Sequence, residues 1–182
     1  KIFGSEVSKD LIISFLNEVI QQEVIVDITF RNVEMLGLKQ DQRRAVFDIF
    51  CENEKGEVFI VEMQKSRQKY FSDRVLYYAS FAIQQQSMIV KEKLEKEPDE
   101  RIRKRWNYHI SKVYVICVLN YIMEPSRSEK YRWDIVRMDR ELKIPFSETL
   151  NEIYLEMPKF VLPLHECDTL YKKWLYVLNN IE

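Results

Sequence analysis

Residues 45–64 read AVFDIFCENEKGEVFIVEMQ and contain two apolar, strand-forming runs joined by a polar segment with a glycine near its end. This pattern predicts two strands connected as a hairpin. If the hairpin folds about Lys55, Asp48 on the first strand faces Glu62 on the second, and the Cβ atoms of such opposite residues lie roughly 4.5–5.5 Å apart. Gln64 follows Glu62 by two residues and therefore points to the same face. Two carboxylates and an amide would then converge on one patch of a largely apolar sheet.

The register of this hairpin decides whether the carboxylates meet, and the sequence leaves the register open. A two-residue turn at Lys55-Gly56 would place Glu62 diagonal to Asp48, with the two carboxylates on opposite faces unless a bulge intervened. The other alternative is an edge hairpin on which both acids face solvent.

Two neighbouring carboxylates on an apolar sheet require a compensating charge. An isolated ionised carboxylate in such a place costs on the order of several kcal/mol, and two side by side repel until one takes up a proton. A divalent cation bridging them removes both penalties, and an all-oxygen ligand set suits Mg²⁺ or Mn²⁺ better than Zn²⁺. Asp48 and Glu62 therefore predict a magnesium site.

Composition limits the class of protein. A chain of 182 residues with 46% hydrophobic residues fits one domain with a substantial core. The three cysteines are far apart, which indicates neither a disulfide framework nor a metal site and favours a reducing, cytoplasmic location. The longest apolar run, residues 113–119, is too short for a membrane span. The net charge of −1 means that nucleic-acid binding would need a local basic patch.

Hydrophobic periodicity predicts the order of the remaining elements. Both faces of the run 58–64 are apolar, as in a central strand covered on two sides. The order indicates an α/β fold around one sheet. The expected elements are a helix over 11–20 with Ser8 as N-cap, a strand or lead-in over 24–30, a loop over 31–44, strands over 45–50 and 58–64, a helix over 66–96, strands over 112–119 and 131–138, a short segment over 153–157 and a helix over 169–179.

The arrangement Asp48…Glu62-x-Gln64 on consecutive strands resembles the PD-(D/E)xK nuclease superfamily, with a glutamine where lysine is more usual. Further blocks make the chain similar to the Rpn-type recombination-promoting nuclease/putative transposase family over nearly its whole length. These blocks are FGSEVSKDLIISFLNEVI from residue 3, FDIFCENEKGEVFIVEMQ from residue 47, RVLYY from residue 74, IYLEMPKF from residue 153 and KWLYVL from residue 173.

The resemblance implies a restriction-endonuclease-like core, a central mixed β-sheet flanked by helices, in a single domain over residues 1–182. Because the chain begins at Lys1 rather than Met, we expect this domain to be trimmed at one or both ends. The implied activity is Mg²⁺-dependent hydrolysis of DNA linked to recombination or mobile elements, with Mn²⁺ as a substitute. The implied partner is DNA and not a membrane, and a homodimer is consistent with nucleases that cut both strands.

The resemblance also implies roles for individual residues. Asp48 and Glu62 would be the metal-binding carboxylates, the backbone carbonyl of Met63 a third ligand, and Gln64 the contact to the attacking water or the phosphate. The neutral side chain of Gln64 leaves an alternative function open, a weak or inactive nuclease fold that binds nucleic acid or protein. RNA or a DNA junction is an alternative substrate.

Basic and aromatic residues outside the hairpin are candidates for contacts to phosphate. Arg74 and Tyr78 lie four residues apart on one predicted helix face, and the alternative is a surface arginine beside a core tyrosine. A second candidate is the basic string that precedes Trp106 and Tyr108, formed by Arg103, Lys104 and Arg105. These residues would contact a nucleic-acid backbone with support from the aromatic rings. The alternative is that they belong to a solvated insertion.

Overall fold

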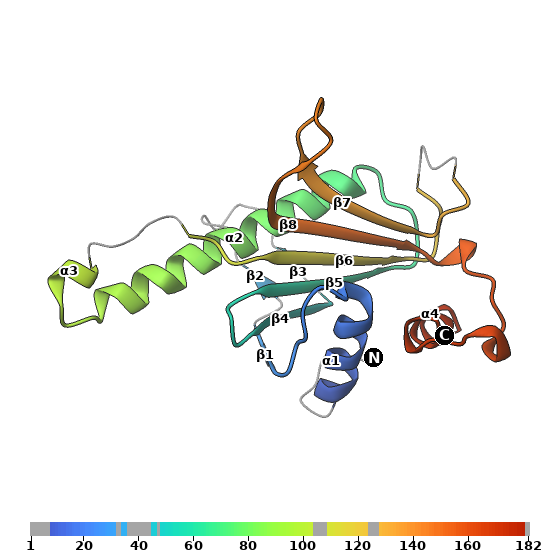
Figure 1. Ribbon diagram of the computed structural model, residues 1–182, viewed down its shortest axis with the longest axis horizontal. Helices are drawn as coiled ribbons and strands as arrows, with labels where there is room; N and C mark the ends of the chain where they lie inside the picture. Colours follow the sequence, from blue (N-terminus) through green and yellow to red (C-terminus); the bar gives the residue numbers. More distant parts are fainter. Residues whose placement is uncertain are drawn as a thin grey trace.

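A mixed sheet forms the centre of the computed structural model (Figure 1). Within the described residues, six strands pair in the order β1-β4-β5-β6-β8-β7, and two short strands, β2 and β3, form a separate sheet. The described residues are 8–31, 34–35, 45–46, 48–103, 109–123 and 128–180. The strands are β1 Ile28–Phe30, β2 Glu34–Met35, β3 Ala45–Val46, β4 Ile49–Asn53, β5 Val58–Gln64, β6 Val113–Leu119, β7 Arg132–Met138 and β8 Pro145–Glu156.

Strand direction divides the large sheet into a parallel centre and antiparallel edges. β5, β6 and β8 run parallel to one another, whereas β1 with β4, β4 with β5, and β7 with β8 are antiparallel. Parallel strands are covered on both faces, and every residue of β6 is buried accordingly. The predicted α/β fold with a mixed sheet is confirmed.

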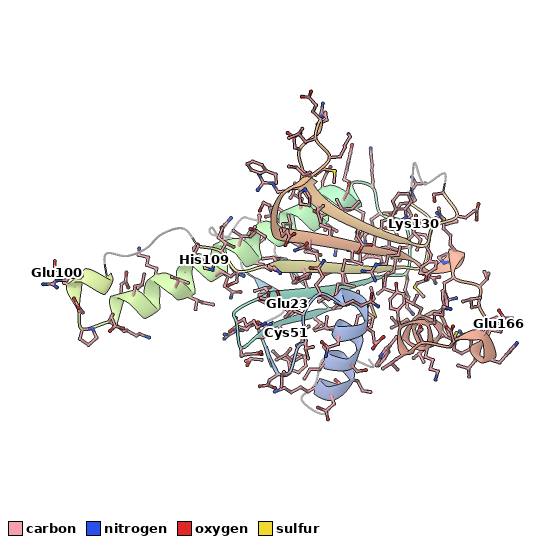
Figure 2. All side chains as sticks on the ribbon, in the orientation of Figure 1. Glu23, Cys51, Glu100, His109, Lys130 and Glu166 are labelled. Carbon is pink, nitrogen blue, oxygen red and sulfur yellow. The ribbon has the colours of Figure 1, made fainter. Side chains whose placement is uncertain are left out.

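Helices cover the two faces of the sheet, with α1 and α4 on one side and α2 on the other (Figure 1). In the described part of the chain, no helix combines the length and the apolar character that crossing a membrane requires. The second half of α2 projects beyond the sheet and leads to α3, and Glu100 marks the far end of this arm in Figure 2. The helices are α1 Lys9–Ile20, α2 Phe71–Glu95, α3 Glu100–Arg103 and α4 Leu170–Asn179, with 3-10 turns η2 Met157–Lys159 and η3 Leu164–Glu166.

The alternation of side chains along β5 determines which face carries the polar residues. Phe59 and Val61 belong to the core under α1 and α4, whereas Val58 and Ile60 belong to the core under α2. Because successive side chains of a strand point to opposite faces, Glu62 continues the set facing α2. The carboxyl end of β5 therefore carries its acid and its amide toward the beginning of α2.

The helix predicted from residue 66 begins only at Phe71, so the predicted start was wrong. Residues 65–70 instead form a turn that takes the chain from the end of β5 onto the face of the sheet. Tyr70 closes this turn at φ 62° and accepts the first helical hydrogen bond, from the backbone N–H of Arg74 at 3.0 Å. The helical propensity of this polar segment did not decide its structure, because the chain turns here between β5 and α2.

Two other predictions are corrected by strand pairing. The segment predicted over 153–157 is the end of the much longer strand β8, which begins at Pro145 and pairs with β7 mainly through residues 151–155. The predicted loop over 31–44 contains the short strand β2, paired with β3. The strands predicted over 58–64, 112–119 and 131–138 are present, as are the first and last helices.

Candidate active site

The two acids that the sequence placed on facing strands lie close together. β4 and β5 pair with Ile49 opposite Val61, which is the register that brings Asp48 across from Glu62 when continued by one residue. The Oδ2 atom of Asp48 accepts a hydrogen bond of 2.7 Å from the backbone N–H of Met63. The alternative register, with the carboxylates on opposite faces, is not the one observed.

The strand predicted over 45–50 is interrupted at Asp48, which corrects the expected backbone. β3 ends at Val46, Asp48 lies in a bend, and β4 begins at Ile49. Here the carboxylate of Asp48 accepts the hydrogen bond from the backbone N–H of Met63. A side-chain oxygen therefore occupies the place of a backbone carbonyl in the pairing between the two strands. Asp48 is exposed as a result, and its carboxylate is accessible to a ligand.

Glu62 occupies a very different environment from Asp48. Its side chain is 2% exposed, and its Oε2 atom accepts a 3.2 Å hydrogen bond from Nε2 of Gln64 and lies 3.6 Å from the guanidinium of Arg74. Its Oε1 atom is buried and has no hydrogen-bond partner within the described residues. Burial, and next the charge of Asp48, raise the pKa of Glu62 to about 7, although Arg74 and Gln64 act in the opposite direction.

Arg74 connects Glu62 to the turn that precedes α2. Its Nε donates a 2.6 Å hydrogen bond to the hydroxyl of Tyr78, and another guanidinium nitrogen donates to the side-chain oxygen of Gln68. The guanidinium carbon also lies 4.8 Å from the centre of the Tyr78 ring. Tyr78 is buried in the core under α2, so it positions Arg74 while its ring packs inside the protein.

The sequence did not point to Gln68 or to its basic neighbours as site residues. A signal was present, because Lys65, Arg67 and Lys69 follow the strand that carries Glu62 within a few positions. Read as part of a helix, these cations would have been distributed around its surface. The turn instead brings Arg67 and Lys69 to one cavity together with Gln68, whereas Lys65 lines a separate cavity with residues of α4.

Of the basic string proposed to contact nucleic acid, only the backbone of Arg103 belongs to the described residues, and it is remote from this site. Arg103 is the last residue of α3, which lies at the far end of the arm from the carboxyl end of β5 (Figure 1). The side chain of Arg103 and all of Lys104 and Arg105 lie outside the described residues.

The donor set fits a hard divalent cation. The described residues contain no group of three or more His, Cys, Asp and Glu side chains that could hold a metal, so the candidate centre depends on two carboxylates and the backbone. In an extended strand the N–H and C=O of one residue point to the same side. The carbonyl of Met63 therefore points, like its N–H, toward Asp48. Together with the unpartnered Oε1 of Glu62, these oxygens match the preference of Mg²⁺.

A mixed sheet flanked by helices, with Asp48 just before one strand of a hairpin and Glu62 on the other, is consistent with the core of the PD-(D/E)XK nucleases. The chain belongs to the PD-(D/E)XK nuclease family transposase family, whose model matches residues 1–182. This membership confirms the resemblance and the fold inferred from the motifs. A comparison with curated proteins and one with solved structures gave no significant match.

The raised pKa of Glu62 predicts that the metal-free protein loses stability as the pH rises from about 4.5 to about 7. Over that range the folded state retains a proton on Glu62 that the unfolded state releases. The free energy of unfolding is therefore highest at low pH and falls until the pH passes the pKa of the folded state. A pKa raised from 4.5 to about 7 corresponds to roughly 3 kcal/mol. Urea unfolding in EDTA at pH 5 and pH 8 measures the difference.

The matched control is Glu62→Gln, which retains the shape of the side chain but does not titrate. Other carboxylates titrate in both proteins, so the difference between wild type and variant isolates this one group. We expect Glu62→Gln to be more stable than wild type at pH 8 and similar to it at pH 5. Equal pH dependence in the two proteins would contradict the prediction.

Proposed function

We propose that this protein is a Mg²⁺-dependent DNA endonuclease in which Asp48, Glu62 and the backbone carbonyl of Met63 hold the ion. The observation that carries the proposal is the buried Oε1 atom of Glu62, which lacks a hydrogen-bond partner among the described residues and lies near a second carboxylate. Without a cation, this arrangement is unfavourable because burial and the neighbouring charge both oppose ionisation. A divalent cation compensates both effects.

A bound ion would polarise the scissile phosphate and lower the pKa of an attacking water. Gln64 donates one amide hydrogen to Glu62 and retains further hydrogen-bonding capacity to orient that water, although without charge. Arg74 supplies the positive charge that a lysine at position 64 would otherwise provide. Its planar guanidinium suits a phosphate, and Tyr78 and Gln68 hold it in place.

DNA is proposed as the substrate because the family is described as a PD-(D/E)XK nuclease family transposase, and transposases act on DNA. The proposal therefore includes a link to recombination or mobile elements and the use of Mn²⁺ in place of Mg²⁺. The direct test is to incubate supercoiled plasmid with the purified protein and either metal. Metal-dependent nicking or linearisation supports the proposal. A plasmid left intact in both metals would instead favour a nuclease fold that binds without turnover.

Metal binding should be visible without any DNA. At a Mn²⁺ concentration 100 times the dissociation constant, binding adds about 2.7 kcal/mol to the stability of the folded state. For a chain of this length, that raises the melting temperature by roughly 5–10 °C. We expect the shift in wild type and its loss in Asp48→Asn, measured by differential scanning fluorimetry.

The control for this measurement is Glu100→Gln, which removes one negative charge at the end of the arm remote from the sheet (Figure 2). This variant should retain the full shift. An equal shift in wild type and Asp48→Asn would show that Mn²⁺ binds elsewhere.

A further inference from the structure

A cavity of about 320 Å³ lies beside the candidate metal site, between the turn that precedes α2 and the segment after β6. It is formed by residues 67–73 together with Tyr121 and Met123, and we call it the loop pocket. Its volume is at the lower end of the roughly 300–1,000 Å³ typical of small-molecule sites. The loop pocket therefore has room for a group of the size of one nucleotide and not for a duplex.

The side chains of the loop pocket combine positive charge with an accessible aromatic ring. Arg67 and Lys69 are basic, and Asp73 in the first turn of α2 is the acidic member. Tyr70 is 65% exposed, and the amino group of Lys69 lies 4.9 Å from the centre of its ring. Cations beside an exposed aromatic face are the chemistry by which proteins bind single-stranded nucleic acid.

Tyr121, in the segment after β6, forms part of the wall of the loop pocket. The hydroxyl of Tyr121 is buried, and none of the described residues forms a hydrogen bond with it. Its ring is held edge-on against Phe71 at a centroid distance of 6.4 Å. The contact with the first residue of α2 joins the two segments that form the loop pocket.

The backbone of Tyr70 is in an unusual conformation. Its φ of 62° lies in the left-handed region, which bulky residues rarely adopt. Glycine or asparagine would occupy this position with less strain, and neither would provide an aromatic ring. Backbone strain of this kind is concentrated at functional sites, where it holds a side chain in a required place.

Gln68 connects the loop pocket to the candidate metal site through Arg74. Gln68 lines the pocket and accepts a hydrogen bond from Arg74. The same Arg74 guanidinium lies 3.6 Å from the carboxylate of Glu62. A strand with its scissile phosphate at Asp48 and Glu62 would therefore have a neighbouring nucleotide at the loop pocket.

On these grounds we infer that the loop pocket binds one unpaired nucleotide of the substrate strand, with its base against Tyr70 and its phosphate near Arg67 and Lys69. This inference rests on the proposed nuclease function and specifies its substrate class. A base must leave the helical stack to enter such a pocket, and this is easiest for a mismatched or single-stranded base. The preferred substrate is DNA with an unpaired nucleotide beside the cut.

The test is equilibrium binding by fluorescence anisotropy in Ca²⁺, with a fully paired duplex of two annealed DNA strands and the same duplex carrying one unpaired thymidine. Stacking of one base on an aromatic side chain corresponds to about tenfold in affinity. We therefore expect wild type and Tyr70→Phe to prefer the unpaired DNA about tenfold, and Tyr70→Ala to bind both DNAs equally.

A second variant keeps the inference testable if Tyr70→Ala fails to fold. The double variant Arg67→Ala/Lys69→Ala should reduce the slope of log affinity against log salt concentration by roughly 1.5, because two phosphate contacts are lost. Arg101→Ala, an exposed arginine of α3 at the end of the arm, should leave the slope unchanged.

Binding and cleavage test the two proposals separately. Equal affinity of wild type for both DNAs, or an unchanged preference in Tyr70→Ala, overturns the inference even if the plasmid is cut. A preference that depends on Tyr70 supports the inference, and if no cleavage is then found, only the proposed catalytic function fails.

Discussion

Replacing Asp48 with Asn or Glu62 with Gln is expected to lower metal-dependent DNA cleavage by at least about 100-fold, since losing even an outer-shell partner of a metal ligand typically costs 10–100-fold. Each substitution keeps the shape of the side chain and removes one anionic oxygen. The amide oxygen of an asparagine at position 48 still accepts the N–H of Met63, so the bend before β4 is preserved. The measurement is kcat/KM for plasmid nicking in Mg²⁺.

The two substitutions differ in their effect on stability, which distinguishes lost chemistry from lost folding. Glu62→Gln removes a buried charge whose ionisation is opposed by burial and by Asp48, so this variant should be more stable than wild type at pH 8 in EDTA. A more stable protein that no longer cuts DNA has lost its site and not its fold. Cleavage at the wild-type rate by one of the variants would exclude the carboxylate that this variant lacks as a metal ligand.

Replacing Lys159 with Met is expected to destabilise the protein by about 3–5 kcal/mol, because it leaves a buried carboxylate without its cation. Glu156, at the end of β8, is 0% exposed, and its Oε2 atom lies 2.6 Å from the amino group of Lys159 in η2. The same carboxylate accepts hydrogen bonds from the backbone N–H of Met123 at 2.6 Å and from Nε1 of Trp133 at 3.0 Å. Urea unfolding at pH 7 measures the loss.

The control for Lys159→Met is the double variant Glu156→Gln/Lys159→Met. Removing both charges avoids a buried ion without a partner, so the double variant should be more stable than the single one. A loss below about 1 kcal/mol in Lys159→Met would place this pair among weak surface ion pairs. Because Met123 also lines the loop pocket, the ion pair holds one wall of that pocket against the sheet.

This pair gives a physical role to the block IYLEMPKF, which the sequence marked only through its resemblance. The block places Glu156 at the last residue of β8 and Lys159 three residues later, across the turn η2. Neither residue type nor spacing indicates that both side chains are buried. Burial follows from β7 and the segment around Met123, which close over the end of β8.

Continuous apolar runs were sufficient to predict the centre of the fold. β5 and β6 each present apolar residues to both faces, which only a covered central strand can use. Periodicity was likewise sufficient for α1 and α4, because each buries one stripe against the other and against the sheet. The first half of β8 had no such signal, because its residues are exposed or half-buried and form no continuous apolar run.

The sequence by itself determined the α/β class and the family, because strand and helix periodicity and the family's sequence blocks can be recognised without a structure. It left open the hairpin register, which the structure fixes by pairing Ile49 with Val61. Only the tertiary structure decided that Glu62 is buried while Asp48 is exposed, and that Arg74 joins Glu62 to Gln68. Burial and charge pairing depend on which elements cover the strand. The packing of α2 against the carboxyl end of β5 brings those residues together.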